Sequence, residues 1–311
     1  IGSGLVGSEM CIRDSFSIAK IIPEEDAIRY MKDAATKSYS KKGDAIVKMN
    51  HDAIDRGANG YVKIDVPASW KDAVDDSTKH VATGDRPELV DYVNNVVIPV
   101  NTFHGKDLPV STFEKYADGT SPQGTAAYEK RGVAVDVPTW IPENCIQCNF
   151  CSMVCPHAVI RPVPMTDAEL AAAQAAVKSK AMTGMPGMNF VMTISTLDCT
   201  GCGSCAEMCP AHGKALFMER AAGRMHDDQE TFEYAKKVGV QQGSGKNVKE
   251  AQFLRPYLEY SGACPGCGET PYAKLLTQLY GDRMYWANAT GCSQAWGSAM
   301  PGIPYTVNRQ G

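Results

Sequence analysis

The sequence predicts a multidomain fragment of the α/β and α+β classes, built around a small central α+β domain. Two cysteine runs of identical spacing predict that domain, because each has the form C-x2-C-x2-C-x3-C-P. Segments of helical periodicity lie toward the amino-terminal end, and a stretch rich in proline and glycine separates them from the cysteines. The length of 311 residues leaves room for about two or three domains.

The two runs have the spacing of iron–sulfur ligands. They are Cys145, Cys148, Cys151 and Cys155 before Pro156, and Cys199, Cys202, Cys205 and Cys209 before Pro210. In two-cluster bacterial ferredoxins, the fourth cysteine of each such run ligates the other cluster. We therefore expect two [4Fe-4S] clusters within residues 136–235. The expected ligand sets are Cys145, Cys148, Cys151 with Cys209, and Cys199, Cys202, Cys205 with Cys155.

Zinc sites, disulfides and buried thiols are the competing explanations for these cysteines. Zinc ligands are usually separated pairs of cysteines with a long gap between them, whereas here four cysteines lie close together, twice. Disulfides between such close neighbours would be strained, and the sequence has no secretory signal. The pattern favours clusters, with zinc as the main alternative.

Composition excludes several classes of function. A net charge of −4, without long charged runs, gives no electrostatic surface for nucleic acid. No stretch of apolar residues is long enough to span a membrane. Twelve cysteines without a secretory signal indicate metal ligation in a reducing compartment, so we expect the cytoplasm.

The amino-terminal part divides into a leader and two helices. Residues 1–15 fit poorly with the rest of the chain and are expected to be foreign or disordered, with Cys11 ligating nothing. A helix start is indicated at Pro23, which acidic residues follow directly. A second helix is expected from about Asp44 to Ala58.

Irregular structure is expected on the approach to the first cysteine run. Residues 61–67 alternate in polarity like an extended segment, and residues 99–145 are rich in proline. We expect a connector whose hydrophobic side chains lie on a neighbouring domain. Trp140, just before the first run, is expected to pack against the first cluster loop.

The insertion between the runs, residues 161–192, is expected to start with an alanine-rich helix over Asp167–Lys180. The methionines of Met182–Met188 fit filler packing over the clusters better than a docking patch. Gly201 and Gly203 either let backbone N–H groups approach sulfur or serve only as turns. Two roles are open for His157 and His212: tuning a cluster, or lying at the surface or in a hydrogen bond. The second role is the favoured interpretation.

A third cysteine group follows a polar stretch, residues 240–250, that we interpret as a linker. Cys264 and Cys267 are closely spaced, and Cys292 follows further on. Spacing alone leaves half a zinc ribbon, unligated thiols and a cluster site all open.

Five landmarks in order give the chain a specific resemblance. They are Val66–Trp70, Glu129–Arg131, the doubled cysteine run, Gly262–Tyr272 and Ala287–Ser293. From about Phe16 to Gly311 the chain resembles the pyruvate:ferredoxin (flavodoxin) oxidoreductase family, as an internal fragment. Without the family marker, Glu129–Arg131 would be interpreted as a solvated charge triplet.

The resemblance implies a domain order. Residues 16–60 would end a gamma-subunit-like domain, 61–135 would form a connecting domain, and 136–235 a ferredoxin-like domain. Residues 236–311 would hold the linker and the start of a thiamine-diphosphate-binding α/β domain. There Cys264, Cys267 and Cys292 would hold a third [4Fe-4S] cluster, which a cysteine outside the chain completes. Glu269 would lie beside the cofactor; its alternative role is an acid at a helix start.

The implied parent enzyme oxidatively decarboxylates pyruvate with coenzyme A, giving acetyl-CoA and carbon dioxide. It uses thiamine diphosphate and Mg2+, passes electrons to ferredoxin or flavodoxin, and is expected to be a homodimer. The fragment would carry the electron-transfer part and be inactive alone. Two alternatives remain: a stand-alone iron–sulfur electron-transfer protein, or an oxidoreductase of another 2-oxoacid.

Overall fold

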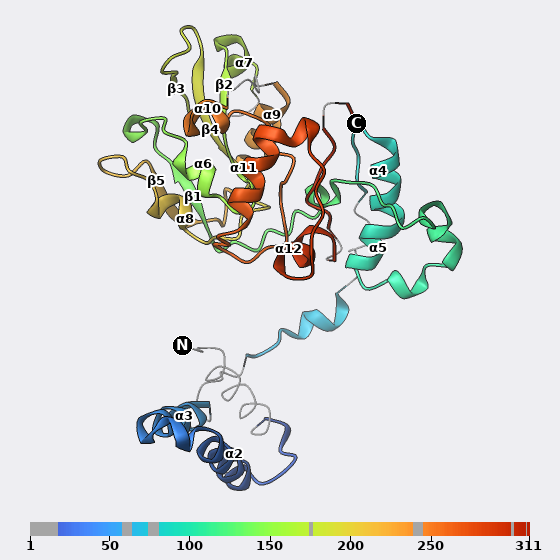
Figure 1. Cartoon of the computed structure of the whole chain (residues 1–311), viewed down its shortest axis with the longest axis vertical. Helices are drawn as coiled ribbons and strands as arrows, with labels where there is room; N and C mark the ends of the chain where they lie inside the picture. The colour runs from blue at the N-terminus through green and yellow to red at the C-terminus, as the bar shows by residue number, and fades with distance from the viewer. Residues whose placement is uncertain are drawn as a thin grey trace. The chain divides into compact units, whose positions relative to one another are not determined.

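The computed structural model describes residues 18–57, 64–73, 81–173, 177–238, 245–299, 302–308 and 310–311. The chain forms two compact units, Ile1–Val74 and Asp75–Gly311 (Figure 1). The expected leader, with Cys11, lies outside the described residues, and so does the first half of the alternating segment 61–67.

The smaller unit is a pair of helices, and both were predicted. Helix α2 (Glu24–Tyr39) begins after Pro23 with three acidic residues in its first turn, which suits the positive end of the helix dipole. Helix α3 (Asp44–Gly57) packs against it through small and branched side chains, including Ala35 and Ile54. Residues 64–67 form no strand; a short 3-10 helix, Ala68–Asp72, follows them.

The larger unit opens with a helical segment that the sequence analysis did not predict. It runs through α4 (Pro87–Tyr92), a π-helical stretch (Val93–Val97) and α5 (Ile98–Asn101). Leu89, Val93 and Val97 form a small core of their own. In the proline-rich segment 99–145, for which contacts with a neighbouring domain were expected, Ala126 and Ala134 join the main core, whereas Tyr128 packs on this small one.

Short 3-10 helices account for much of the remaining non-strand structure. They are Ser40–Lys42 in the smaller unit, and Gly105–Asp107, Val110–Tyr116, Thr125–Tyr128, Pro142–Asn144 and Gly281–Arg283 in the larger one.

Two antiparallel sheets form the centre of the larger unit. Strand β1 (Asp136–Trp140) pairs with β5 (Leu216–Arg220), so that Trp140 faces Leu216 across the ladder. The second sheet has the order β2-β4-β3, with β2 at Ile160–Met165, β3 at Lys180–Ala181 and β4 at Asn189–Ile194. Pro162 and Pro164 are tolerated in β2 because it is an edge strand, where a missing N–H donor breaks no ladder.

The insertion between the cysteine runs folds as most of this second sheet. Its helix α7 spans Asp167–Ala171; of the rest of the predicted helix over Asp167–Lys180, residues 172–173 and 177–179 are not helical, Lys180 is in β3, and residues 174–176 lie outside the described residues. Thr166 and Glu169 form a capping box that starts the helix. Further on, Lys180 pairs in β3 and donates to the carbonyl of Cys145 at 2.9 Å. These tertiary hydrogen bonds override the helix propensity of the alanines.

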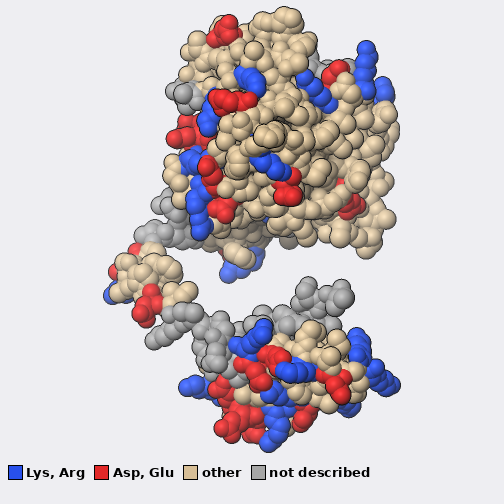
Figure 2. Space-filling view, turned by 90° about the vertical axis from the view of Figure 1, so that its left-hand side faces the viewer, with Lys and Arg blue, Asp and Glu red and all other residues tan. Residues whose placement is uncertain are grey.

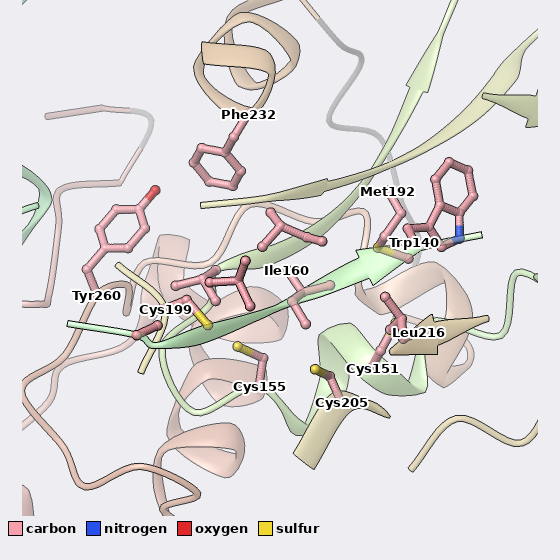
Figure 3. Packing of buried hydrophobic residues seen from close by; sticks show 14 of the residues in the cluster. Trp140, Cys151, Cys155, Ile160, Met192, Cys199, Cys205, Leu216, Phe232 and Tyr260 are labelled. Carbon is pink, nitrogen blue, oxygen red and sulfur yellow. The ribbon is translucent and has the colours of Figure 1, made fainter. Parts of the chain in front are cut away.

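Short helices carry or flank the cysteines, and longer ones cover the sheets. Their bounds are α6 Phe150–Val154, α8 Ser204–Glu207, α9 Met225–Val238, α10 Val248–Ala251, α11 Thr270–Tyr280 and α12 Cys292–Gln294, which the π-helical turn Ala295–Ala299 follows. Helix α9 packs on β2 and β4 and buries Phe232 completely. Phe232 and Tyr260 lie above the strands and the thiols below them (Figure 3).

Helix α10 occupies part of the expected linker. Asn247 caps it by accepting from the N–H of Glu250, and the next residues, Ala251 to Phe253, are buried. Phe253 meets Phe190 of β4 edge to face. This segment therefore packs on the ferredoxin-like part of the unit instead of spacing two domains apart.

Charges are interspersed on the face of the molecule shown in Figure 2, where Lys and Arg alternate with Asp and Glu. Among the described residues, no helix has both the length and the apolar character that crossing a membrane requires.

Candidate metal centres

Four cysteines of the first expected set line one cavity. Cys145, Cys148 and Cys151 reach it from the first loop and helix α6, and Cys209 reaches it from beyond α8. Trp140, Met192 and Leu216 form its apolar wall. Trp140 thus packs against the first cysteine loop, as predicted.

The second set lines a separate cavity. Cys199, Cys202 and Cys205 come from the second loop and α8, and Cys155 comes from the carboxyl end of α6. The thiols of Cys155, Cys199 and Cys205 share one space beneath the strands (Figure 3). Each cavity therefore takes three cysteines from one run and the fourth from the other.

Helix α6 makes this exchange possible. It is only five residues long, and it places Cys151 at the first cavity and its C-cap residue, Cys155, at the second. Helices α6 and α8 pack against each other, which holds the two loops in a fixed relation.

The two loops share one backbone conformation. Gln147 and Asn149 in the first loop have positive φ, and Gly201 and Gly203 have it at the same places in the second. The conformation turns N–H groups toward sulfur: Gln147 N lies 3.4 Å from Cys145 Sγ, and Gly201 N lies 3.4 Å from Cys199 Sγ. Glycine is the residue that adopts this backbone most easily.

Side-chain hydrogen bonds hold the first loop in this shape without glycine. Gln147 donates to the carbonyl of Ala181 and accepts from the N–H of Thr183, both at 2.8 Å. Asn149 donates to the carbonyl of Lys249, also at 2.8 Å. Sequence reasoning identified the two glycines but missed Gln147 and Asn149, because the partners that hold them are distant in sequence.

In the metal-free chain, burial raises the pKa of the innermost cysteine thiols. Desolvation, reinforced by neighbouring cysteines, raises the pKa of Cys151 to about 12. Desolvation also raises the pKa of Cys199 to about 12 and that of Cys205 further. These thiols keep their protons at neutral pH until a metal displaces them.

The residues present fit an iron–sulfur cluster. Within the described part of the chain, no three Cys, His, Asp or Glu side chains gather closely enough to hold a single metal ion. The four thiols of each set instead surround a cavity, and apolar side chains and sulfur-directed N–H groups complete it. A cluster needs ligands spread around a body several ångströms across, with donors to its sulfurs.

A larger cavity, about 540 Å³, lies on another side of Trp140 and contains no cysteine. Arg224, which lines it, already donates to Thr139 and to the carbonyl of Pro138. Since no cysteine lines it, it is not the candidate metal centre.

The third cysteine group lies partly against the second set. A Cβ added to Gly266, between Cys264 and Cys267, would lie 3.9 Å from the Cβ of Cys202. Cys267 packs on a small core that includes Trp296, one turn beyond Cys292. Cys264 and Cys292 are exposed, and the structure does not gather Cys264, Cys267 and Cys292 into one group.

Glu269 occupies the N-cap position of α11, makes no capping hydrogen bond with its side chain, and is exposed to solvent. Its carboxylate accepts from Trp296 Nε1 at 3.4 Å. The position fits the helix-start role, and its place beside a cofactor remains a proposal.

Glu129, Lys130 and Arg131 are not a solvated triplet. Lys130 Nζ lies 2.6 Å from a carboxylate oxygen of Asp198, the residue before Cys199, and 4.5 Å from the ring centre of Tyr260. Glu129 is nearly buried and pairs with Arg131. The triplet therefore braces the approach to the second cysteine loop.

The two histidines differ. His157 is buried, shares a 2.9 Å hydrogen bond with the carbonyl of Ser261, and has a pKa that burial lowers. His212 is exposed. The favoured interpretation, a surface or hydrogen-bonded histidine, is confirmed for both. Met182, Met185 and Met188 pack on the main core, as the filler interpretation expected.

Comparison with known proteins agrees with this geometry. A family model described as a 4Fe-4S dicluster domain matches residues 144–213, and the EKR model, a domain of unknown function, matches residues 76–134. The pyruvate:ferredoxin oxidoreductase of Moorella thermoacetica is 49% identical over 300 residues, covering 95% of this chain and 25% of that protein. The pyruvate-flavodoxin oxidoreductase of Enterobacter agglomerans is 46% identical over 298 residues, with the same shares.

Nearly the whole chain is similar to pyruvate:ferredoxin and pyruvate-flavodoxin oxidoreductases. This confirms the resemblance that the motifs indicated. The mitochondrial NADP(+) pyruvate dehydrogenase of Euglena gracilis is also 42% identical over 301 residues, which are 95% of this chain and 16% of that protein. The chain spans about a quarter of the length of the oxidoreductases it matches.

Proposed function

We propose that the larger unit is an electron-transfer module holding two [4Fe-4S] clusters. Cys145, Cys148, Cys151 and Cys209 would hold one, and Cys199, Cys202, Cys205 and Cys155 the other. The observation that supports this most strongly is the pair of cavities, each lined by three cysteines of one run and the fourth of the other.

A bound [4Fe-4S] cluster takes up and gives off single electrons at a potential that its surroundings set. The chain contributes the surroundings: thiolate ligands, N–H donors at Gln147 and Gly201, and apolar walls that exclude water. Excluding water and holding donors in place reduces the rearrangement that accompanies each electron.

The closeness of Gly266 to Cys202 supports a direction for electron transfer through the module. It makes the second set the one adjacent to the Cys264–Cys267 loop. We propose that loop, with Cys292, as three ligands of a third [4Fe-4S] cluster on the entry side, and Glu269 as a residue beside thiamine diphosphate. The first set, whose loop exposes Ile146, would then face the external electron carrier.

For the longer protein to which these residues correspond in the relatives, we propose oxidative decarboxylation of pyruvate. Coenzyme A would be the co-substrate, acetyl-CoA and carbon dioxide the products, and thiamine diphosphate with Mg2+ the cofactor. Ferredoxin or flavodoxin would accept the electrons, since the names of the relatives specify both. We retain the homodimer and the cytoplasm as parts of this proposal.

Two further candidates each have an observation in their favour. The NADP(+) enzyme of Euglena gracilis matches the same 95% of the chain, so a different final acceptor fits this module equally well. A 2-oxoacid other than pyruvate is the second candidate, because the chain corresponds to only a quarter of those relatives and its cysteine cavities do not select a substrate. Comparing several 2-oxoacids as electron donors in the longer protein distinguishes them.

Metal content of the chain tests the module directly. After anaerobic reconstitution we expect about eight iron and as much acid-labile sulfide per chain, with spin-coupled signals in electron paramagnetic resonance after reduction. Cys155→Ser should remove the cluster of the second run and Cys209→Ser that of the first, whereas the control Cys264→Ser should keep both.

Two results would contradict the proposal. Tight zinc without reducible iron would rule out electron transfer. If Cys155→Ser instead removed the cluster of its own run, the exchange of ligands between the runs would be wrong.

A further inference from the structure

One lysine is buried where the two cysteine sets meet. Lys274 of helix α11 is 2% exposed. Its Nζ donates to the backbone carbonyl of Ser152 and to Oε1 of Gln252, the latter at 3.3 Å. Ser152 lies on α6 between Cys151 of the first set and Cys155 of the second. The ammonium group therefore lies against a helix that serves both cavities.

No carboxylate neutralises this ammonium group. Among the residues that the structure describes, no Asp or Glu lies within ion-pair distance of Lys274, and its two acceptors are neutral oxygens. Arg161 adds repulsion and is itself paired with Glu259. Burying an unpaired charge is strongly unfavourable, so such a site is expected to have an anion nearby.

The cysteines are the groups that favour the charged lysine. Desolvation lowers the pKa of Lys274 to about 8, while Cys155 and, less strongly, Cys151 oppose that shift. Four thiolates around a cluster carry net negative charge, and reduction of the cluster adds more. The counter-charge that the lysine lacks is therefore the charge that a cluster brings.

We propose that Lys274 is the shared counter-charge of the two metal centres and raises the reduction potential of both, more strongly for the set that contains Cys155. This rests on the proposed function, because it requires clusters in both cavities. A cation beside a cluster stabilises its reduced form, which carries the additional electron. Lys274 acts as a positioning residue through charge and contacts no substrate.

A purely structural role is the competing explanation. The bonds from Lys274 to Ser152 and Gln252 join α11 to α6 whether or not the lysine is charged. Removing them would then weaken folding and leave the potential of any bound cluster unchanged. A substitution that keeps a donor but removes the charge separates the two roles.

The test is a potentiometric titration of the reconstituted chain, followed by electron paramagnetic resonance. Lys274→Gln keeps an N–H donor for the Ser152 carbonyl and removes the charge. We expect its second-set cluster to be at least tenfold harder to reduce, which is about 59 mV lower for a one-electron couple. The first-set cluster should shift in the same direction by less, and Lys274→Arg should restore both potentials.

Gln278→Met is the matched control. Gln278 lies one turn further along α11, is 8% exposed, and donates to the carbonyl of Leu254 at 2.9 Å. Its replacement removes a buried polar contact from the same helix without changing charge, so both potentials should stay unchanged.

Wild-type potentials in Lys274→Gln, at full iron content, would overturn the inference. If Lys274→Gln does not fold, Lys274→Met provides the same test, because its unbranched side chain fills the space without charge. Failure of the proposed function is distinct, since the wild-type chain itself would then bind no reducible iron.

Discussion

Single residues with left-handed backbone set the shape of both cysteine loops. Gly201 and Gly203 adopt it freely, whereas Gln147 and Asn149 need side-chain hydrogen bonds to hold it. A Cβ at Gly203 would meet nothing within 4 Å, but one at Gly201 would lie 3.0 Å from the carbonyl oxygen of Asp136. An added methyl group should therefore lower the free energy of unfolding by different amounts at the two glycines.

We expect Gly203→Ala to lower the free energy of unfolding by about 1–2 kcal/mol, the cost of left-handed backbone for a residue with a Cβ. Gly201→Ala should lose more, because the backbone oxygen of Asp136 must also move. Urea unfolding of the metal-free chain measures both. Gly268→Ala is the control, since Gly268 has neither a positive φ nor a neighbour within 4 Å. Equal losses of unfolding free energy in Gly201→Ala and Gly203→Ala would contradict the prediction.

The buried thiols give the metal-free chain a pH dependence. Cys151 and Cys199 have pKa values raised to about 12, so the folded chain holds these protons more tightly than the unfolded chain. Stability should be full below about pH 9, where thiols of the unfolded chain remain protonated, and fall as the pH rises from there toward 12.

Each thiol should contribute up to about 1.4 kcal/mol per pH unit in that range. Denaturation at pH 7 and pH 10, under reductant, measures the fall. Cys151→Ala and Cys199→Ala should each flatten the profile, and Cys264→Ala should not, because Cys264 is exposed. A chain whose stability rises over this range would refute the argument.

At the level of elements, the Glu129–Arg131 segment and the second cysteine loop form one braced unit. Asp198 is nearly buried beside Cys199; desolvation raises its pKa, and the ion pair with Lys130 opposes that shift. The N–H of Gly132 also donates to the carbonyl of Leu197 at 2.8 Å. These contacts give a structural role to a segment whose sequence shows only three adjacent charged residues.

Lys130→Met should therefore destabilise the chain by about 3 kcal/mol, the lower end of what removing one partner of a buried ion pair costs, because Lys130 is partly exposed. Lys115→Met is the matched control, since its pair with Asp91 is largely exposed and should matter little. Thermal and urea unfolding measure both variants. Comparable losses for the two lysines would show that the pair with Asp198 does not brace the loop.

Sequence reasoning predicted the elements whose signals are local. The cysteine spacing indicated the two sets that line the cavities, and the acidic start of α2 and the apolar periodicity of α3 marked those helices. It failed for the helix over Asp167–Lys180, which tertiary hydrogen bonds shorten, and it did not find α4. Likewise Lys274 has no sequence signal, because its burial depends on packing of α11 against α6.

At the scale of the whole molecule, the two cysteine runs of the larger unit lie between two chain segments that pack against them. The segment before β1 braces the second loop through Lys130, and the segment after α9 packs on the core through Phe253 and Tyr260. Arg161 of β2 also pairs, buried, with Glu259 of that later segment. The module is therefore held from both sides by chain outside the cysteine runs.

The exchange of the fourth cysteine between the runs has a consequence for assembly. Neither run carries a complete set of four cysteines for one cavity, since α6 ends in Cys155 at the second cavity and α8 leads to Cys209 at the first. A peptide that held only one run could therefore complete neither cavity, and both runs must fold together before either cavity has its four cysteines.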